Sequence, residues 1–295
     1  MLMKRLCPVF IGVLFLISAT CHADPGISIV TTIQPLEYFI EKIGGKHVSV
    51  TTIIPPGGNP HTYEPTPGQI SAISKADLYV RVGSGLEFEL IWMERLRALN
   101  KRMAVCDVSE GINLIEMGID YYGDKHESDH HIHGAMDPHI WLSPVNGIII
   151  ARNIGRALKE IDPENSKYYS DNTSRLINEL NLLIEEIRSR LKGLKKKAFL
   201  IFHPSWGYFA RDFGLIQIPV EFAGKEITPA RLSRIIKMAK KEDIRAVFAS
   251  PQFSKKSASV IANEINGKVI MIDPMKKDYI ENLRAVSEAL KENMR

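Results

Sequence analysis

The first part of the chain alternates between short runs rich in β-branched residues and longer stretches whose apolar residues recur with helical spacing. Runs of the first kind are typical of buried strands, and stretches of the second kind are typical of covering helices. The pattern predicts strands at 27–32, 48–54, 77–82 and 103–106, and helices at 35–44, 66–76 and 87–99. Because helices and strands take turns along the chain, we expect a parallel sheet flanked by helices.

The same alternation returns in the last third of the chain, although the two halves show no repeat in sequence. The predicted strands there are 198–202, 216–221, 246–249 and 269–272, and the predicted helices are 205–212, 229–242, 255–265 and a last one from 279. We therefore expect a second parallel sheet, also flanked by helices.

A long stretch with no internal proline separates the two halves. Its apolar positions, which recur in steps of three and four, are Leu176, Leu180, Leu183, Ile184, Ile187 and Leu191. This spacing places them in one stripe along a helix. A coiled coil is the alternative, but the stripe lasts only about three heptads. We predict an α/β protein of two lobes, 24–162 and 195–295, joined by one long rigid helix over 163–194.

The first 23 residues have the pattern of a secretory signal peptide. Lys4 and Arg5 give a positive start, residues 9–19 a short apolar core, and Ala23 a small residue at the expected cleavage site. An uncleaved membrane anchor is the alternative, but the apolar run is shorter than the roughly 20 residues that span a bilayer. A lipoprotein anchored at Cys21 is a further alternative, which the preceding residues match poorly. We expect a periplasmic protein.

Removal of the signal peptide changes the charge and the cysteine count. The whole chain has 38 basic and 34 acidic residues, and loss of Lys4 and Arg5 leaves a net charge near +2. This balance gives no reason to expect a nucleic-acid partner. Of three cysteines only Cys106 remains, so a hydrophobic core rather than a disulfide must stabilise the fold. About 270 mature residues fit two domains better than one.

Four side chains of the kind that bind metals each lie beside a proline, far apart in the sequence. They are His61 after Pro60, His139 after Pro138, His203 before Pro204 and Asp273 before Pro274. Three imidazoles and one carboxylate form a plausible four-coordinate set for zinc. His203 and Asp273 directly follow predicted strands, and the carboxyl ends of parallel strands are where α/β sheets bind ligands. Each residue alone is weak evidence, and Glu221 is a rival fourth ligand.

A polar tract at 124–133 holds four of the nine histidines of the chain. They are His126, His130, His131 and His133. A flexible run of this kind can bind borderline cations weakly and without fixed geometry. The alternative is a solvated loop whose histidines bind nothing.

Several segments resemble the metal-binding receptors of bacterial ABC importers, the cluster A-I zinc and manganese family. The matching segments are 55–67, 76–80, 137–144, 202–209 and 272–274. The resemblance covers essentially the whole mature chain and implies two α/β lobes joined by a long helix. It also implies that His61, His139, His203 and Asp273 bind the metal, and that a membrane permease receives it.

The number of imidazoles bears on which metal is bound. Manganese and iron members of the family often have a carboxylate where His203 stands, and a third imidazole favours Zn(II) over the more oxygen-seeking Mn(II). We predict a monomeric receptor, not an enzyme, with zinc as its cargo. A manganese or iron receptor of the same family is the alternative.

A rival from another class is a secreted zinc-dependent hydrolase. Three histidines with an open fourth position would activate a water molecule, and Glu221 or Glu226 would serve as the general base. Against this, the chain has no His-Glu-x-x-His run, and Asp273 would fill the fourth position. A surface adhesin on the receptor fold is a third option, for which the chain offers no added binding module.

Overall fold

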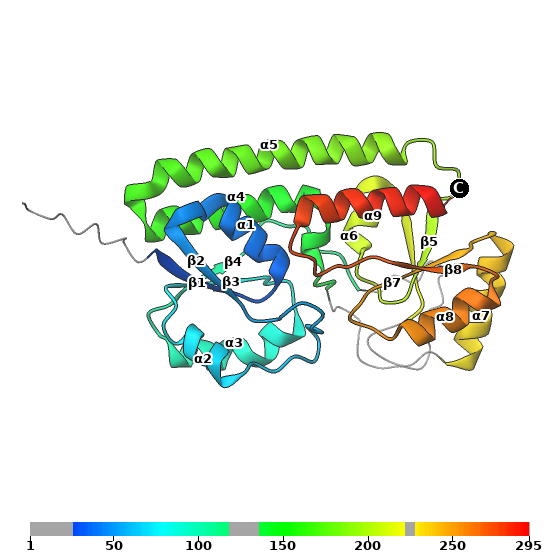
Figure 1. The fold of residues 1–295 in the computed structure, drawn as a ribbon, viewed down its shortest axis with the longest axis horizontal. Helices are drawn as coiled ribbons and strands as arrows, with labels where there is room; N and C mark the ends of the chain where they lie inside the picture. The colour runs from blue at the N-terminus through cyan, green and yellow to red at the C-terminus, as the bar shows by residue number, and fades with distance from the viewer. Residues whose placement is uncertain (1–25, 118–135, 222–227, 295) are drawn as a thin grey trace, which may run out of the picture.

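The computed structural model describes residues 26–117, 136–221 and 228–294. The predicted signal peptide, the histidine-rich tract 124–133 and Glu226 all lie outside these residues. Within them, two parallel sheets with four strands each are flanked by helices, and one long helix runs along both (Figure 1). The predicted two-lobed α/β fold is therefore confirmed.

The N-terminal sheet has the order β2-β1-β3-β4, and each neighbouring pair is parallel. Its strands are β1 (Ile27–Thr31), β2 (Val48–Thr52), β3 (Leu78–Arg81) and β4 (Ala104–Asp107). The helices between them are α1 (Gln34–Gly44), α2 (Pro67–Ile73) and α3 (Glu87–Leu99). In Figure 1, α1 lies above the sheet while α2 and α3 lie below it. Cys106 is buried in β4, as expected from its apolar neighbours.

The C-terminal sheet repeats the arrangement with the order β6-β5-β7-β8, again all parallel. Its strands are β5 (Ala198–Ile201), β6 (Ile216–Pro219), β7 (Ala246–Ala249) and β8 (Lys268–Met271). The helices are α6 (Gly207–Phe213), α7 (Pro229–Lys241), α8 (Lys255–Glu264) and α9 (Tyr279–Asn293). In both sheets the first strand of the lobe pairs with the second strand on one side and with the third strand on the other. Successive strands are therefore added first on one side of that strand and then on the other, although all of them run parallel.

The long helix α5 covers Ser166–Leu191 and is preceded by a 3-10 turn at Pro163–Asn165. Its 26 residues span about 39 Å at 1.5 Å per residue. All six residues of the predicted apolar stripe are buried. The larger hydrophobic core extends from the N-terminal sheet through α5 and α9 to β5 of the second lobe. The two lobes are thus packed on one shared layer of helices (Figure 1).

Helix α4 (Pro144–Ile161) was not among the predicted elements. Ser143 caps it by accepting a hydrogen bond from the backbone of Asn146, and proline occupies its first position. Gly147 and Gly155 weaken the helical signal in the sequence. A Cβ at Gly155 would lie 2.3 Å from Thr173 Oγ1, and one at Gly147 would lie 3.0 Å from the Tyr279 hydroxyl. The glycines therefore allow α4 to approach α5 and α9 closely.

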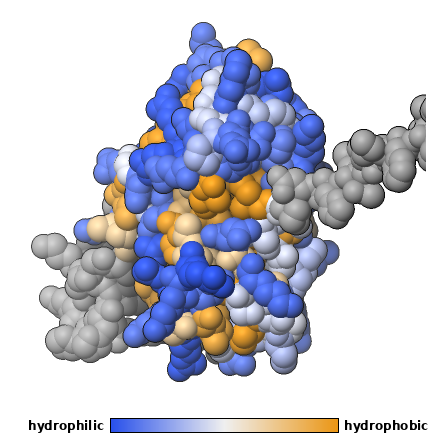
Figure 2. Space-filling view, turned by 90° about the vertical axis from the view of Figure 1, so that its left-hand side faces the viewer, coloured by the Kyte–Doolittle hydropathy of each residue, from blue (hydrophilic) through white to orange (hydrophobic). Residues whose placement is uncertain are grey.

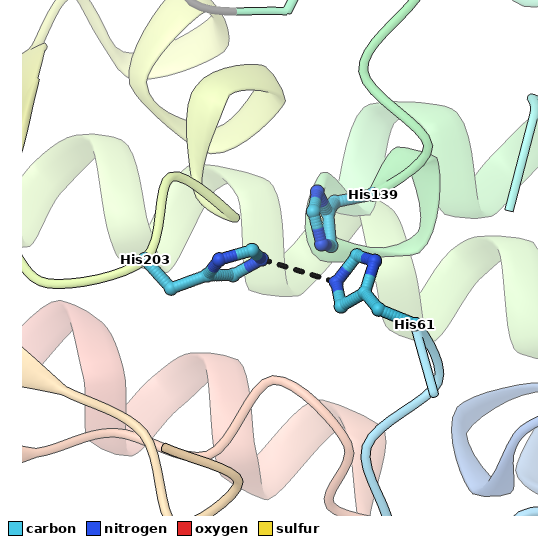
Figure 3. A group of neighbouring side chains, drawn as sticks. All are labelled: His61, His139 and His203. Carbon is cyan, nitrogen blue, oxygen red and sulfur yellow. Dashed lines mark hydrogen bonds between the residues drawn. The ribbon is translucent and has the colours of Figure 1, made fainter. Parts of the chain in front are cut away.

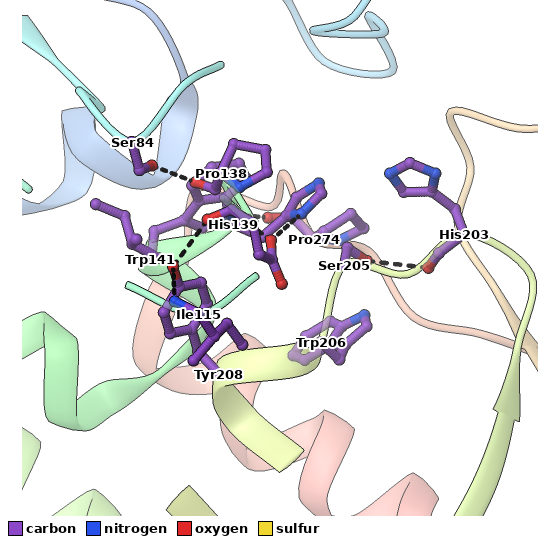
Figure 4. Close-up of polar contacts among 12 residues, drawn as sticks. Ser84, Ile115, Pro138, His139, Trp141, His203, Ser205, Trp206, Tyr208 and Pro274 are labelled. Carbon is purple, nitrogen blue, oxygen red and sulfur yellow. Dashed lines mark hydrogen bonds and ion pairs between the residues drawn. The ribbon is translucent and has the colours of Figure 1, made fainter. Parts of the chain in front are cut away.

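Hydrogen bonds also connect the lobes next to the predicted ligands (Figure 4). The indole of Trp141 donates to the carbonyl of Pro274 over 2.7 Å, and the hydroxyl of Tyr208 donates to the carbonyl of Asp137 over 2.8 Å. All four residues adjoin or lie near a predicted ligand in the sequence. Each bond of this kind adds about 1 kcal/mol to stability and fixes one lobe against the other.

The outer surface at the end of the N-terminal lobe is largely hydrophilic, with apolar residues gathered across its middle (Figure 2). Such a mixture is normal, because apolar atoms contribute over half of the surface of a folded protein. No helix in the described part of the chain is long and apolar enough to cross a membrane.

Candidate metal centre

Two of the predicted ligands lie where strands end, and the other two lie in loops. His203 follows β5 by two residues and Asp273 follows β8 by two. His61 lies in the loop between β2 and α2, and His139 begins the 3-10 turn Ile140–Leu142. Proline next to each of these residues restricts the backbone and keeps the side chain on a stiff segment.

The structure brings three of the four predicted ligands together. His61 and His139 from the N-terminal lobe meet His203 from the C-terminal lobe (Figure 3), and one nitrogen of each lies within 4.8 Å of the others. The Nε2 atoms of His61 and His203 are 3.2 Å apart. Two nitrogens bound to one tetrahedral zinc at about 2.0–2.1 Å would be separated by about 3.3 Å. The spacing fits a single zinc ion between them.

Asp137 orients the imidazole of His139. Its Oδ1 accepts hydrogen bonds from the Nδ1 of His139 over 2.7 Å and from the backbone nitrogen of His139 over 2.9 Å. Because an ionised carboxylate only accepts, Nδ1 must carry the proton, and the lone pair of the ring lies on Nε2. Ser84 holds the same segment by donating to the carbonyl of Pro138 (Figure 4). His139 is therefore prepared in the tautomer that binds a metal through Nε2.

Glu87 acts on His61 in the same way. Its Oε2 accepts from the Nδ1 of His61 over 2.7 Å, which leaves Nε2 of that ring without the proton. Partial burial raises the pKa of Glu87, but the hydrogen bond and charge of His61 outweigh it and hold the pKa below its usual value. Glu87 thus remains ionised as a partner for the imidazole.

His203 is held differently. Its Nδ1 lies 3.7 Å from Oε2 of the buried Glu221, too far for a hydrogen bond, and no described residue accepts from this nitrogen. Instead, the ring of Phe253 stacks on the imidazole with 4.2 Å between centroids and an angle of 21°. Burial lowers the pKa of His203 to about 4, helped by the nearby His139 and His61 and opposed by Glu221. The ring is therefore neutral at physiological pH, as metal binding requires.

Asp273 lies outside the group of three histidines. Its Oδ1 accepts hydrogen bonds from the amide of Gln252 over 2.8 Å and from the backbone nitrogen of Met275 over 2.9 Å. Glu221, the rival fourth ligand, is on the Nδ1 side of His203, whereas the 3.2 Å contact with His61 is on the Nε2 side.

A small pocket lies at the point where the imidazoles meet. It is lined by Pro60, His61, His139, Trp141, His203, Gln252, Phe253, Pro274 and Met275. The cavity volume of about 10 Å³ is close to the room that one water molecule needs and far below the roughly 300–1,000 Å³ that is typical of small-molecule sites. The pocket suits an ion better than an organic ligand.

Several residues around the centre were not predicted from the sequence. Asp137 lies in one of the segments that resemble the family, and a carboxylate two residues before a histidine is a usable signal for it. Glu87, Gln252 and Phe253 come from segments with no sequence link to the ligands. The histidines of the tract at 124–133 lie outside the described residues, so their weak binding of metal stays a prediction.

A two-lobed α/β fold with a histidine cluster between its lobes defines a class of metal-ion receptor. The model of the family described as zinc-uptake complex component A, periplasmic, matches residues 29–293, and the chain belongs to this family. The prediction of a periplasmic zinc receptor of an ABC importer is therefore confirmed, with zinc as the bound ion. The hydrolase alternative gains no support, because the family consists of transport receptors.

Known relatives agree with this assignment. The chain is 30% identical over 280 residues to the high-affinity zinc uptake system protein ZnuA of Bacillus subtilis, covering 91% of this chain and 88% of that protein. A crystal structure of ZnuA superposes with a TM-score of 0.84 at 39% identity, covering 92% of this chain and all of the other.

A laminin-binding protein of Streptococcus agalactiae, described as having both adhesin and metal-transporting activity, superposes with a TM-score of 0.79 at 27% identity. That match covers 92% of this chain and all of the other. The fold is thus shared by receptors whose described roles differ.

Proposed function

We propose that the chain captures one Zn(II) ion on the Nε2 atoms of His61, His139 and His203. The observation that carries the proposal is the 2.7 Å contact that two of these rings make through Nδ1 with a carboxylate oxygen. Carboxylates accept hydrogen bonds from the Nδ1–H groups of His61 and His139, and the lone pair of each ring is thereby left on Nε2. Zinc–imidazole sites commonly have this carboxylate–histidine arrangement.

Asp273 is proposed as the fourth ligand. It follows β8 on the same edge of the C-terminal sheet as His203, and the next residue, Pro274, lines the pocket. Its Oδ1 is engaged by two donors, which leaves Oδ2 to bind the ion. A carboxylate would complete a tetrahedral set and offset part of the charge of the ion.

Competition binding tests the site. The purified protein is stripped with a chelator and titrated with Zn(II) against Mn(II), alongside His203→Ala and a matched variant, His47→Ala. His47 packs on Tyr168 and Tyr169 rather than in the pocket. We expect one tight zinc site that excess manganese does not displace and that only His203→Ala weakens. Preference for manganese would refute the choice of metal, and absence of a tight site would refute the convergence of the ligands.

Delivery to the membrane permease of an ABC importer is the proposed fate of the ion, with the protein acting as a monomer. Because α5 and the bonds between the lobes tie both halves together, release is expected through small shifts of loops rather than wide opening. Structures with and without zinc that differ by a large rotation between lobes would contradict this. Reconstituted uptake with the cognate permease tests the delivery itself.

The proposed route out of the cytoplasm uses residues 1–23 as a cleaved signal peptide, and the tract 124–133 then collects metal for the main site. Mass spectrometry of the mature protein distinguishes a start at Asp24 from a lipid-modified Cys21. Deletion of 124–133 should slow zinc capture at low concentration. An unchanged capture rate and affinity would remove that role.

A further inference from the structure

The loop between β7 and α8 contacts both of the metal-binding positions of the C-terminal lobe. Phe253 stacks on His203, and its neighbour Gln252 donates to the carboxylate of Asp273. Both residues line the pocket. Two consecutive side chains therefore contact the two predicted ligands of this lobe.

The chemistry of the carboxylate fixes the orientation of the Gln252 amide. An ionised carboxylate can only accept hydrogen bonds, so the amide must turn its Nε2 toward Asp273 Oδ1 and its Oε1 away. That Oε1 is buried and accepts no hydrogen bond from any described residue. A buried oxygen without a donor lowers stability, so packing alone does not explain a glutamine at this position.

The two oxygens of Asp273 are not equivalent. Oδ1 receives the amide of Gln252 at 2.8 Å and the backbone nitrogen of Met275 at 2.9 Å. A carboxylate oxygen has two lone-pair directions, and these two donors occupy both. Oδ2 is the oxygen that keeps its lone pairs for a cation.

The main chain around Asp273 is fixed separately. Its carbonyl accepts from Asn282 Nδ2 over 2.7 Å, and the carbonyl of Pro274 accepts from Trp141 over 2.7 Å. The freedom that remains is rotation of the carboxylate about its own side-chain bonds. Gln252 and the backbone of Met275 are the groups that restrict this rotation.

We propose that Gln252 determines metal preference by restricting Asp273 to a single oxygen contact with the ion. The inference rests on the proposed function, in which Asp273 is the fourth ligand. One oxygen with three imidazoles gives the four-coordinate set that zinc favours. A carboxylate binding through both oxygens would raise the coordination number and supply the extra oxygen that Mn(II) prefers. Gln252 is thus a positioning residue that acts through Asp273.

The test uses Gln252→Met in the full chain, which keeps the length of the side chain and removes the donor. We expect the ratio of zinc to manganese affinity, measured by competition, to fall at least tenfold. The visible spectrum of the Co(II)-loaded protein should change from the intense bands of a four-coordinate site to the weaker bands of a five-coordinate one. Gln252→Asn, whose amide is one methylene too short, gives a second variant if the first does not fold.

Matched variants separate this effect from damage to the loop. Ser250→Ala changes a buried polar residue of the same loop whose hydroxyl forms no hydrogen bond with any described residue, and it should leave the ratio and the spectrum unchanged. In an Asp273→Asn background, Gln252→Met should add nothing further.

Suppose that Gln252→Met keeps the wild-type affinity ratio and spectrum while Asp273→Asn binds zinc more weakly. This result would overturn the role of Gln252 but not the assignment of Asp273 as a ligand. Unchanged zinc binding in Asp273→Asn would overturn both the role of Gln252 and the assignment of Asp273 as the fourth ligand. Loss of the proposed function itself would show earlier, as absence of a tight zinc site in the wild type.

Discussion

The two lobes present their imidazoles to the metal centre by different physical means. In the N-terminal lobe, the carboxylates of Asp137 and Glu87 each accept a hydrogen bond from the Nδ1–H of a histidine over 2.7 Å. In the C-terminal lobe, the ring of His203 has no such bond and is held by stacking on Phe253 and by burial. The sheets have the same strand order, so the difference lies in the loops.

The comparison shows two ways to keep a lone pair available on an imidazole. A hydrogen bond to a carboxylate fixes which nitrogen carries the proton but also favours the charged ring. Burial disfavours the charged ring but leaves the tautomer free. The proposed site combines both, with two histidines oriented by carboxylates in one lobe and one buried, neutral histidine in the other. Four measurements test this difference.

The first measurement concerns the stability of the metal-free protein in acid. The pKa of His203 is about 4 in the folded chain and 6.5 in a model imidazole. Between those values the unfolded chain binds the extra proton, so the stability that neutral His203 contributes is complete above pH 6.5 and is lost as the pH falls to 4. At 1.36 kcal/mol per pKa unit, the free energy of unfolding should fall by about 3 kcal/mol.

Urea denaturation of the chelator-treated protein at pH 7 and pH 4.5 measures this loss. His203→Asn, which lacks the titrating ring, serves as the matched variant and should lose clearly less stability between the two values. An equal loss in both proteins would mean that burial does not set the protonation of His203.

The second measurement concerns Asp137→Ala. The substitution removes the acceptor of the His139 Nδ1–H, so the hydrogen bond that fixes the tautomer and the orientation of the ring is lost. Zinc affinity should therefore fall about 10- to 100-fold. Competition with a chromophoric chelator measures the affinity. Glu221→Ala is the control from the other lobe, since its carboxylate lies 3.7 Å from the His203 ring, and we expect a smaller loss. A larger loss for Glu221→Ala would reverse the comparison.

The third measurement concerns Glu87→Gln, for which zinc affinity should fall about tenfold, the lower end for a residue that supports a ligand. The side chain of Glu87 is 40% exposed, against 4% for Asp137, so solvent and salt screen its charge. The difference from wild type should shrink as ionic strength rises. Glu94→Gln, an exposed change on the same helix, should have no effect.

The fourth measurement concerns Phe253→Leu, which removes the ring that stacks on His203. Aromatic pairs contribute about 0.5–1.5 kcal/mol beyond their buried area, so zinc affinity should fall roughly two- to tenfold. Phe213→Leu, which removes a ring that contacts Phe209 away from the pocket, is the matched control. A loss larger than that of Asp137→Ala would show that stacking is the stronger orienting force.

Much of the fold could be predicted because its elements follow local periodicity. The strands and the apolar stripe of α5 were predicted to within a few residues, since burial on a sheet or along a helix leaves a regular pattern. Helix α4 was missed because Gly147 and Gly155 are unfavourable in helices taken alone. Glycine is needed at these two positions because α4 packs closely against α5 and α9 there. A local sequence pattern cannot predict such a contact.

At the metal centre, too, some residues could be predicted from the sequence and others could not. Residues with distinctive chemistry beside proline could be selected as ligands from the sequence, and the structure brings three of them together. The partners that orient them could not be selected, because Glu87 is 26 residues from His61 and Phe253 is 50 residues from His203 in the chain. Glutamate and phenylalanine are also common in ordinary surfaces and cores, so only their positions in space give them a role.

The exposure of His61 has a consequence for the speed of metal transfer. Its side chain is 17% exposed, against 3% for His139 and 8% for His203, and it belongs to a loop rather than to a strand end. We expect this ring to leave the ion first and to open one coordination position to an incoming ligand. Transfer would then be an associative exchange whose rate rises with the concentration of the acceptor. A stopped-flow rate of zinc loss that is independent of chelator concentration would indicate spontaneous dissociation instead.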